Sequence, residues 1–147
     1  MTIALDTDVL VNWAMEGTAF HRAARHFVER QLRGGERAAL TPSVLNEFVH
    51  VTTDPRRFRS PLGMKDAVAR AREIWAAPEV VRIHPTPEVV LRTLQLLESL
   101  SLGRKRILDT ALAATLELAG VRRLATFNRK DFEVFPFLEL VSPRRVT

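Results

Sequence analysis

The chain has 147 residues, of which 46% are hydrophobic and 27% are charged, and its formal net charge is +5. This length suits one domain that buries roughly 70% of the surface exposed by its unfolded form, and the composition is globular and not disordered. The absence of cysteine excludes disulfides and thiolate zinc sites, and it fits a reducing cytoplasm. We therefore expect residues 1–147 to form a single cytoplasmic domain.

The beginning of the chain does not look like a targeting segment. It lacks a basic region, and Asp6 and Asp8 interrupt its apolar stretch. Nowhere do about 18 apolar residues follow one another, so no membrane span is expected. The basic excess is consistent with a polyanionic partner, although it is equally consistent with a surface that only keeps the protein in solution.

Strand and helix patterns alternate along the chain. The expected strands are Thr2–Leu5, Arg37–Leu40, Val80–Ile83, Arg123–Thr126 and Leu138–Val141, with helical patterns between them. This order predicts an α/β fold in which crossover helices join parallel strands.

Local signals mark several helix ends. Thr41 before Pro42 and Thr86 before Pro87 are typical N-caps followed by a first-turn proline. Gly34-Gly35 and Gly120 stand where helices commonly end. The basic segment 54–61 joins two helices and is the expected mobile or binding loop.

Four acidic residues are expected to meet at one edge of the sheet. Asp6 ends the first strand, Asp131 follows the fourth, and Glu47 and Asp109 lie in the opening turns of helices. Because ligands bind beyond the carboxyl ends of the strands in open parallel sheets, this arrangement predicts a carboxylate-lined site. Hard cations prefer oxygen ligands, so the site fits Mg²⁺ or Mn²⁺.

Each acid also has a purely structural explanation. Asp8 could merely cap the first helix, and Glu47 could form a salt bridge to an arginine, because its helix face also carries apolar residues. Asp109 could complement the dipole of its helix, a contribution of about 0.3–1 kcal/mol. Asn128 and Asp131 could be turn residues. For single residues these explanations are strong, but four coincidences at one sheet edge favour a shared site.

Four segments in chain order resemble the PIN-domain ribonucleases, and within them the VapC-type toxins of bacterial toxin–antitoxin pairs. They are Leu5–Val11, Leu45–Phe48 with Thr53–Arg56, Asp109–Ala114 and Leu124–Phe132. The resemblance covers nearly the whole chain. It implies a Rossmann-like three-layer sandwich whose central parallel sheet of four or five strands has the order 3-2-1-4-5.

The resemblance also implies a divalent-metal site formed by Asp6, Glu47, Asp109 and an acid after the fourth strand. We assign Asp131 as that acid. The expected metal ligands are Asp6, Asp109 and Asp131, and Glu47 would bind a second ion, orient water or accept a proton.

The chain departs from the apparent family at two positions near this site. The family usually has asparagine where Asp8 stands, and many members have an acid where Asn128 stands. We expect Asp8, Thr126 and Asn128 to support the site or to contact substrate.

The activity implied by the resemblance is hydrolysis of RNA phosphodiester bonds with Mg²⁺ or Mn²⁺ as cofactor. Two basic runs are candidates for holding RNA phosphates, and Phe58 is a candidate stacking surface. The runs are Arg56, Arg57 and Arg59, and Arg104, Lys105 and Arg106. An ordinary solvated surface explains both runs equally well.

The expected partners, besides RNA, are a cognate antitoxin and a second copy of the chain. By analogy, the antitoxin would insert an amphipathic segment into a groove near the site and place an arginine on the carboxylates. The apolar helical segments Val89–Leu102 and Ile107–Ala119 predict more hydrophobic surface than a small sheet can cover, which favours a homodimer.

Two other functions remain open at this point. Asp6-Thr7-Asp8-Val9 resembles the start of haloacid-dehalogenase-like phosphatases, in which the first aspartate is a covalent nucleophile and the second a general acid. The other alternative is a non-catalytic PIN-like module that binds RNA or a partner. Retention of Asp6, Glu47 and Asp109 favours catalysis over that module.

Overall fold

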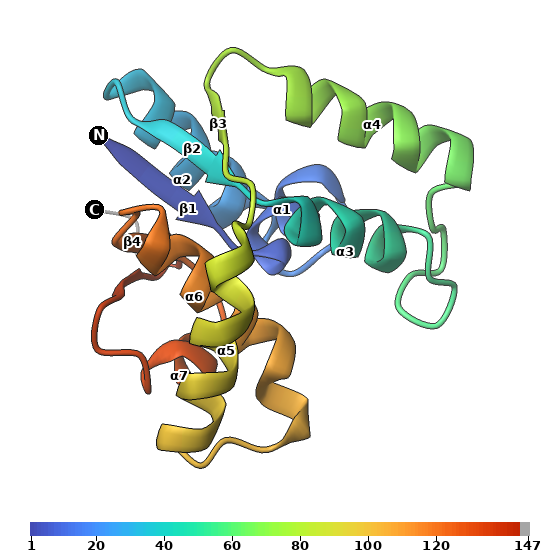
Figure 1. Cartoon of the computed structure of the whole chain (residues 1–147). Coiled ribbons are helices and arrows are strands. Elements are labelled where there is room, and N and C mark those ends of the chain that lie inside the picture. The colour runs from blue at the N-terminus through green and yellow to red at the C-terminus, as the bar shows by residue number, and fades with distance from the viewer. Residues whose placement is uncertain (145–147) are drawn as a thin grey trace.

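The computed structural model describes residues 1–144 and contains a sheet of five parallel strands in the order β3-β2-β1-β4-β5 (Figure 1). The strands are β1 (Thr2–Leu5), β2 (Arg37–Leu40), β3 (Val80–Arg82), β4 (Arg123–Ala125) and β5 (Glu139–Val141). The predicted fold and strand order are confirmed. Residues 145–147, which belong to the expected domain, lie outside the described residues.

Three strands are one residue shorter than predicted. β3 ends before Ile83, β4 ends before Thr126, and β5 begins after Leu138. The backbone amides of Ile83 and Thr126 still donate to Leu40 (2.8 Å) and Val141 (3.1 Å) on the neighbouring strands. The two residues therefore terminate the ladder where the chain turns away from the sheet.

Helices connect the strands and cover the sheet. They are α1 (Thr7–Ala14), α2 (His21–Arg33), α3 (Pro42–Thr52), α4 (Met64–Ala76), α5 (Pro87–Ser99), the 3₁₀ helix η1 (Arg104–Arg106), α6 (Ile107–Leu118) and α7 (Arg129–Phe132). α5 begins at Pro87, as the Thr86-Pro87 signal predicts, and it ends three residues before the end of the predicted apolar stretch Val89–Leu102, where Ser101 has a positive φ of 51°. α6 is one residue shorter than predicted.

The connections place the helices in two layers. α1 to α4 link β1, β2 and β3 in one direction across the sheet, and α5 to α7 link the remaining strands in the other direction. Because such crossovers are right-handed, the two sets cover opposite faces. In Figure 1, α2 lies behind the strands, whereas α5 and α6 lie in front of them and pack on each other.

The helix-end signals act largely as the sequence indicates. The Thr41 hydroxyl accepts a hydrogen bond from the Val44 amide (3.3 Å) and caps α3. Thr86 precedes the first-turn proline of α5, but its side chain makes no capping bond. Gly35 and Gly120 follow helices with φ of 84° and 73°, a conformation that glycine adopts without strain.

The core lies between the sheet and the two helical layers. Strands β1 and β2 carry small or branched side chains that are almost fully buried, and Phe48, Leu116, Leu124 and Phe132 pack around them. No helix within residues 1–144 is both long enough and apolar enough to cross a bilayer. The packed sheet fixes the carboxyl ends of β1 and β4 side by side, and the candidate site lies there.

Candidate functional site

A cleft at the carboxyl ends of β1 and β4 is lined by four acidic side chains. They are Asp6, Asp8, Glu47 and Asp109. The remaining lining residues are Thr7, Val11, Asn12, Thr18, Val51, Arg57, Phe58 and Asn128. Three of the four predicted catalytic acids therefore share one cleft, together with Asp8 and Asn128.

Asp6 is held rigidly at the start of α1. Its Oδ1 accepts a hydrogen bond from the Thr7 amide (2.8 Å), and its Oδ2 accepts one from the Thr126 hydroxyl (2.8 Å). The residue is 8% exposed. Burial raises the pKa of Asp6 above its usual value, although the bonds from Thr126 and Thr7 act in the opposite direction. Asp6 is therefore a buried carboxylate with both oxygens oriented.

Asp8 does not cap α1, so that structural explanation is wrong. Asp6 occupies the N-cap position, and Asp8 lies in the first turn of the helix. Its Oδ2 accepts a hydrogen bond from the Phe127 amide (3.2 Å), while Oδ1 is buried without a partner among residues 1–144. Burial and then the neighbouring charge of Asp6 raise the pKa of Asp8 to about 8. The departure from the apparent family thus adds a second acid beside Asp6, and one of its oxygens is buried without a partner within residues 1–144.

Glu47 reaches the cleft from the second turn of α3, not from the opening turn that the sequence predicts. Its Oε2 accepts a hydrogen bond from the Thr7 hydroxyl (2.8 Å). No arginine pairs with Glu47 in the described part of the chain, so the expected salt bridge is absent there. Thr7 thereby connects Glu47 to Asp6.

Asp109 lies in the first turn of α6, as predicted, and is partly buried. Burial and then the charge of Asp6 raise the pKa of Asp109 to about 6, and the Arg106 guanidinium lowers it. The shift shows that Asp109 and Asp6 are close enough to repel each other. Both carboxyl groups can therefore be ionised together only when a positive charge lies close to them.

The structure separates Asn128 from Asp131. Asn128 lines the cleft, and its backbone amide donates to the Thr126 hydroxyl (3.0 Å). Asp131 lies in α7, a short helix that the sequence does not predict, and it does not line the cleft. Its charge nevertheless raises the pKa of both Asp6 and Asp109. Asp131 therefore stands at the border of the acidic cluster.

The six basic residues predicted to bind RNA do not lie together: one lines the cleft, one is turned inward, and four are exposed outside the cleft. Arg57 lines the cleft beside Phe58, and its guanidinium is 3.7 Å from the carboxylate of Asp54. Arg106 turns inward, where its guanidinium donates to the backbone carbonyl of Asp131 and its Nε is buried. The other four side chains are exposed outside the cleft: Arg56, Arg59, Arg104 and Lys105.

The structural roles of Thr7 and Arg106 could not be predicted, although Arg106 was named as a candidate RNA contact. Thr7 donates hydrogen bonds to both Asp6 and Glu47. Arg106, directly before α6, donates to the Asp131 carbonyl and so connects α7 to the start of α6. The only sequence signal for Thr7 is its position directly after a strand-ending aspartate. Arg106 carries no signal of its own, because its partner is a backbone carbonyl 25 residues away.

The donor set fits a hard divalent cation. The acidic side chains of the cleft offer oxygen ligands, and the buried Oδ1 of Asp8 has no donor among residues 1–144. Within residues 1–144, no three acidic or histidine side chains stand as close together as the ligands of one ion. Binding of one cation by several of these carboxylates would therefore require side chains to rearrange within the cleft.

Comparisons with known proteins agree on the family. Residues 3–138 match the PIN domain. Ribonuclease VapC33 of Mycobacterium tuberculosis is 27% identical over 135 residues, which are 92% of each chain.

Solved structures show the same fold at low identity. VapC20 of M. tuberculosis, a toxin that cleaves the sarcin-ricin loop, has 22% identity and a TM-score of 0.63, with 88% of this chain and 92% of that chain covered. VapBC2 of Rickettsia felis, bound to a promoter DNA fragment, has 16% identity and a TM-score of 0.68, with 97% and 98% covered. VapBC-1 of nontypeable Haemophilus influenzae has 14% identity and a TM-score of 0.69, with 99% and 100% covered. The chain therefore belongs to the PIN-domain family and is similar to its VapC toxins.

Proposed function

We propose that this protein is an Mg²⁺- or Mn²⁺-dependent endoribonuclease and the toxin of a VapBC-type pair, acting in the cytoplasm as one PIN nuclease domain of residues 1–147. The main support for this proposal is one cleft that is lined by Asp6, Glu47 and Asp109. It is supported by the family match and by a relative named as a ribonuclease.

Asp6 and Asp109, with Asp131 at the border, would hold the cation. A divalent cation bound there compensates charge on the phosphate and acidifies the attacking water. Thr7 and Thr126 each donate a hydrogen bond to one oxygen of Asp6, and these bonds orient the carboxylate before a cation binds. Glu47 can accept the proton of the attacking water. Arg57 and Phe58 would place an RNA phosphate and base at the mouth of the cleft.

The test is incubation of the purified protein with single-stranded RNA in Mg²⁺ and in EDTA. Cleavage only with the metal is expected. A haloacid-dehalogenase-like phosphatase would instead release phosphate from p-nitrophenyl phosphate and trap an aspartyl-phosphate on Asp6. A non-catalytic module would leave both substrates intact. Either of these results would contradict the proposal.

The fourth acidic position can be assigned by metal titration. We expect Asp131→Asn to weaken Mn²⁺ binding and slow cleavage, because a neutral amide is a poorer ligand for a hard cation than a carboxylate. Asn128→Ala should raise KM with little change in metal affinity. Calorimetric titration of Mn²⁺ into both variants measures this. If Asp131→Asn binds Mn²⁺ with unchanged affinity, then Asp131 is not a metal ligand, and the fourth position belongs to Asn128 or has no protein ligand.

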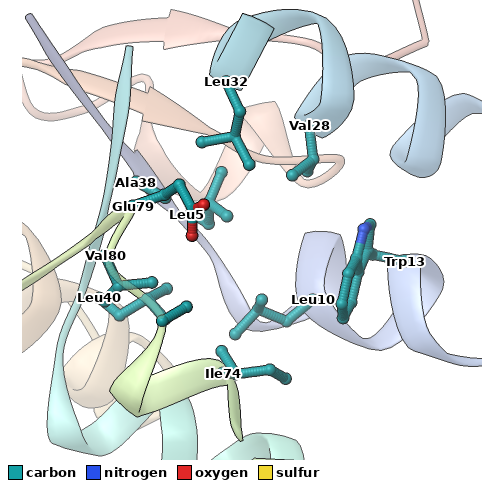
Figure 2. Close-up of a pocket in the computed structure, with 11 residues that line it drawn as sticks. Leu5, Leu10, Trp13, Val28, Leu32, Ala38, Leu40, Ile74, Glu79 and Val80 are labelled. Carbon is teal, nitrogen blue, oxygen red and sulfur yellow. The ribbon is translucent and has the colours of Figure 1, made fainter. Parts of the chain in front are cut away.

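The antitoxin would occupy an apolar groove bounded by α1, α2, α4 and β3 (Figure 2). In Figure 2, Leu10, Trp13 and Ile74 extend toward its centre, and Leu5, directly before Asp6, forms part of its wall. An amphipathic antitoxin segment would bury its apolar face there and end close to the carboxylates. Co-purification with the product of an adjacent reading frame, lost in Trp13→Glu, is the expected result. A complex that withstands Trp13→Glu would contradict this position.

A homodimer is proposed on the outer surface of α5 and α6. Val90, Leu91 and Leu94 are 57–71% exposed on α5, and Leu108 is 68% exposed on α6, which packs against α5. We expect light scattering at micromolar concentration to give twice the 16.6 kDa mass of the chain.

The surface can be tested by one pair of variants. Leu91→Glu should shift the mass toward that of a monomer, because it places a charge in the apolar contact. Met64→Glu is the matched control, since Met64 is 58% exposed on the distant helix α4. A monomeric wild-type protein would contradict the dimer, and equal effects of both substitutions would contradict this location.

A further inference from the structure

A basic groove runs along the β5 edge of the sheet, outside the acidic cleft. His26 and Arg30 of α2 form one side, Arg129 of α7 forms the other, and Leu140–Ser142 at the end of β5 contribute to its lining. A second hollow continues along α2 and shares His26 and Arg30 with the first. The groove thus combines cationic walls with a partly apolar floor.

Consecutive residues of the chain link the wall of the acidic cleft to the wall of the groove. Phe127 donates its amide to Asp8, Asn128 lines the acidic cleft, and Arg129 lines the basic groove. The Phe127 ring stacks on Phe20 with centroids 4.8 Å apart and planes 14° apart. This stack fixes the wall at which the cleft passes into the groove.

The C-terminal end of the described chain adds another cation at the same place. The guanidinium of Arg144 lies 4.4 Å from the centre of the Phe20 ring, and the Arg144 amide donates to the hydroxyl of Ser142 in the groove (3.4 Å). Arg144 is therefore held against the aromatic stack by a cation–π contact.

Acidic neighbours neutralise the positive charge of the groove only in part. Arg30 forms no ion pair within residues 1–144, and Glu29 pairs instead with Arg33 (3.8 Å). The pair between Arg129 and Glu133 (3.3 Å) has both side chains more than half exposed. Exposed pairs of this kind are weak, so an anion can compete for Arg129.

We propose that this groove holds the backbone phosphates of single-stranded RNA on one side of the cleaved bond. The strand would pass from Arg57 through the acidic cleft, past Asn128, to Arg129 and Arg30. Grooves that track single strands combine basic side chains with aromatic rings in this manner, and their phosphate contacts carry most of the affinity. This inference rests on the proposed ribonuclease function.

The test uses Arg30→Gln combined with Arg129→Gln, and it measures binding of fluorescent RNA in EDTA, where the protein does not cleave. For a 16-nucleotide RNA, loss of two phosphate contacts should weaken binding roughly 10-fold and reduce the salt slope by about 1.4. The KM in Mg²⁺ of a 3-nucleotide RNA, which is too short to reach from the acidic cleft into the groove, should be unchanged. In Mg²⁺, KM for the long RNA should rise while kcat stays constant.

Two variants control for charge and folding. Arg37→Gln combined with Arg122→Gln removes the same two charges from exposed side chains at the amino end of the sheet, and this variant should bind both RNAs like wild type. Arg30→Lys combined with Arg129→Lys keeps the charge and should restore most of the affinity. Thermal unfolding of each variant checks that the fold is intact.

The outcomes separate this inference from the function on which it rests. If wild type cleaves RNA and the groove variants bind the long RNA like wild type, the groove assignment is wrong and the ribonuclease proposal stands. Equal weakening by Arg37→Gln combined with Arg122→Gln would also overturn the assignment, because the effect would then be one of net charge. If wild type neither binds nor cleaves RNA, both proposals are wrong.

Discussion

Replacing Asp6 or Asp109 by asparagine is expected to abolish Mg²⁺-dependent RNA cleavage. A catalytic cation supplies several kcal/mol of stabilisation to the transition state, so its loss corresponds to about a 1000-fold lower rate or more. Asp6 and Asp109 line the same cleft, and the charge of Asp6 raises the pKa of Asp109 when no counter-charge is present. Cleavage rates of the two variants, measured with and without Mg²⁺, check this.

The substitutions should leave the fold intact. The amide introduced by Asp6→Asn has nearly the shape of the carboxylate, its oxygen can still accept from the Thr7 amide, and the Thr126 hydroxyl can change from donor to acceptor. Removal of one charge from a repelling cluster should stabilise the metal-free protein modestly. Glu73→Gln, on the exposed side of α4, serves as the control and should cleave like wild type. Near wild-type cleavage by either cleft variant would contradict the metal-site assignment.

The metal-free protein is expected to lose stability as the pH rises from about 4 to about 8. In the folded protein the pKa of Asp8 is about 8 and that of Asp109 about 6, compared with 3.8 for an ordinary aspartate. Between these values the folded state binds more protons than the unfolded state, so the free energy of unfolding falls with rising pH. The loss should be on the order of a few kcal/mol, most of it from Asp8.

Asp8→Asn tests the cause of this pH dependence. The variant should be more stable than wild type at pH 8 and should lose most of the decline between about pH 6 and 8, because its amide does not ionise. Thermal unfolding in EDTA at several pH values measures the effect, with Glu73→Gln as the control. Added Mn²⁺ should restore the stability of wild type at pH 8, because it binds the ionised cleft of the folded state. A wild-type profile that rises over this range would refute the account of the buried carboxyls.

The fold could be predicted from sequence where local patterns are strong. Strands β1 and β2 were predicted to the residue, because each is a short apolar run directly before a helix-capping residue. The ends of β3, β4 and β5 depend on pairing with neighbouring strands and were misplaced by one residue. Helix α7 has four residues, too few for a helical period to appear.

The sequence predicts those site residues that stand directly at the end of a strand or at the start of a helix. Asp6 and Asp109 follow from those positions, whereas the second-turn location of Glu47 depends on where α3 begins. The role of Asp8 was not accessible, because its partner is the amide of Phe127, 119 residues away. Local preference favoured Asp8 as the helix cap, but in the fold Asp6 takes that position.

A crystal of the protein soaked with Mn²⁺ would test the central claim most directly. Anomalous diffraction locates the ion without any assumption about activity. The account predicts a peak in the acidic cleft, about 2.1 Å from carboxylate oxygens of Asp6 and Asp109. A cleft without such a peak at saturating Mn²⁺, or an ion bound only by residues outside the cleft, would contradict the account.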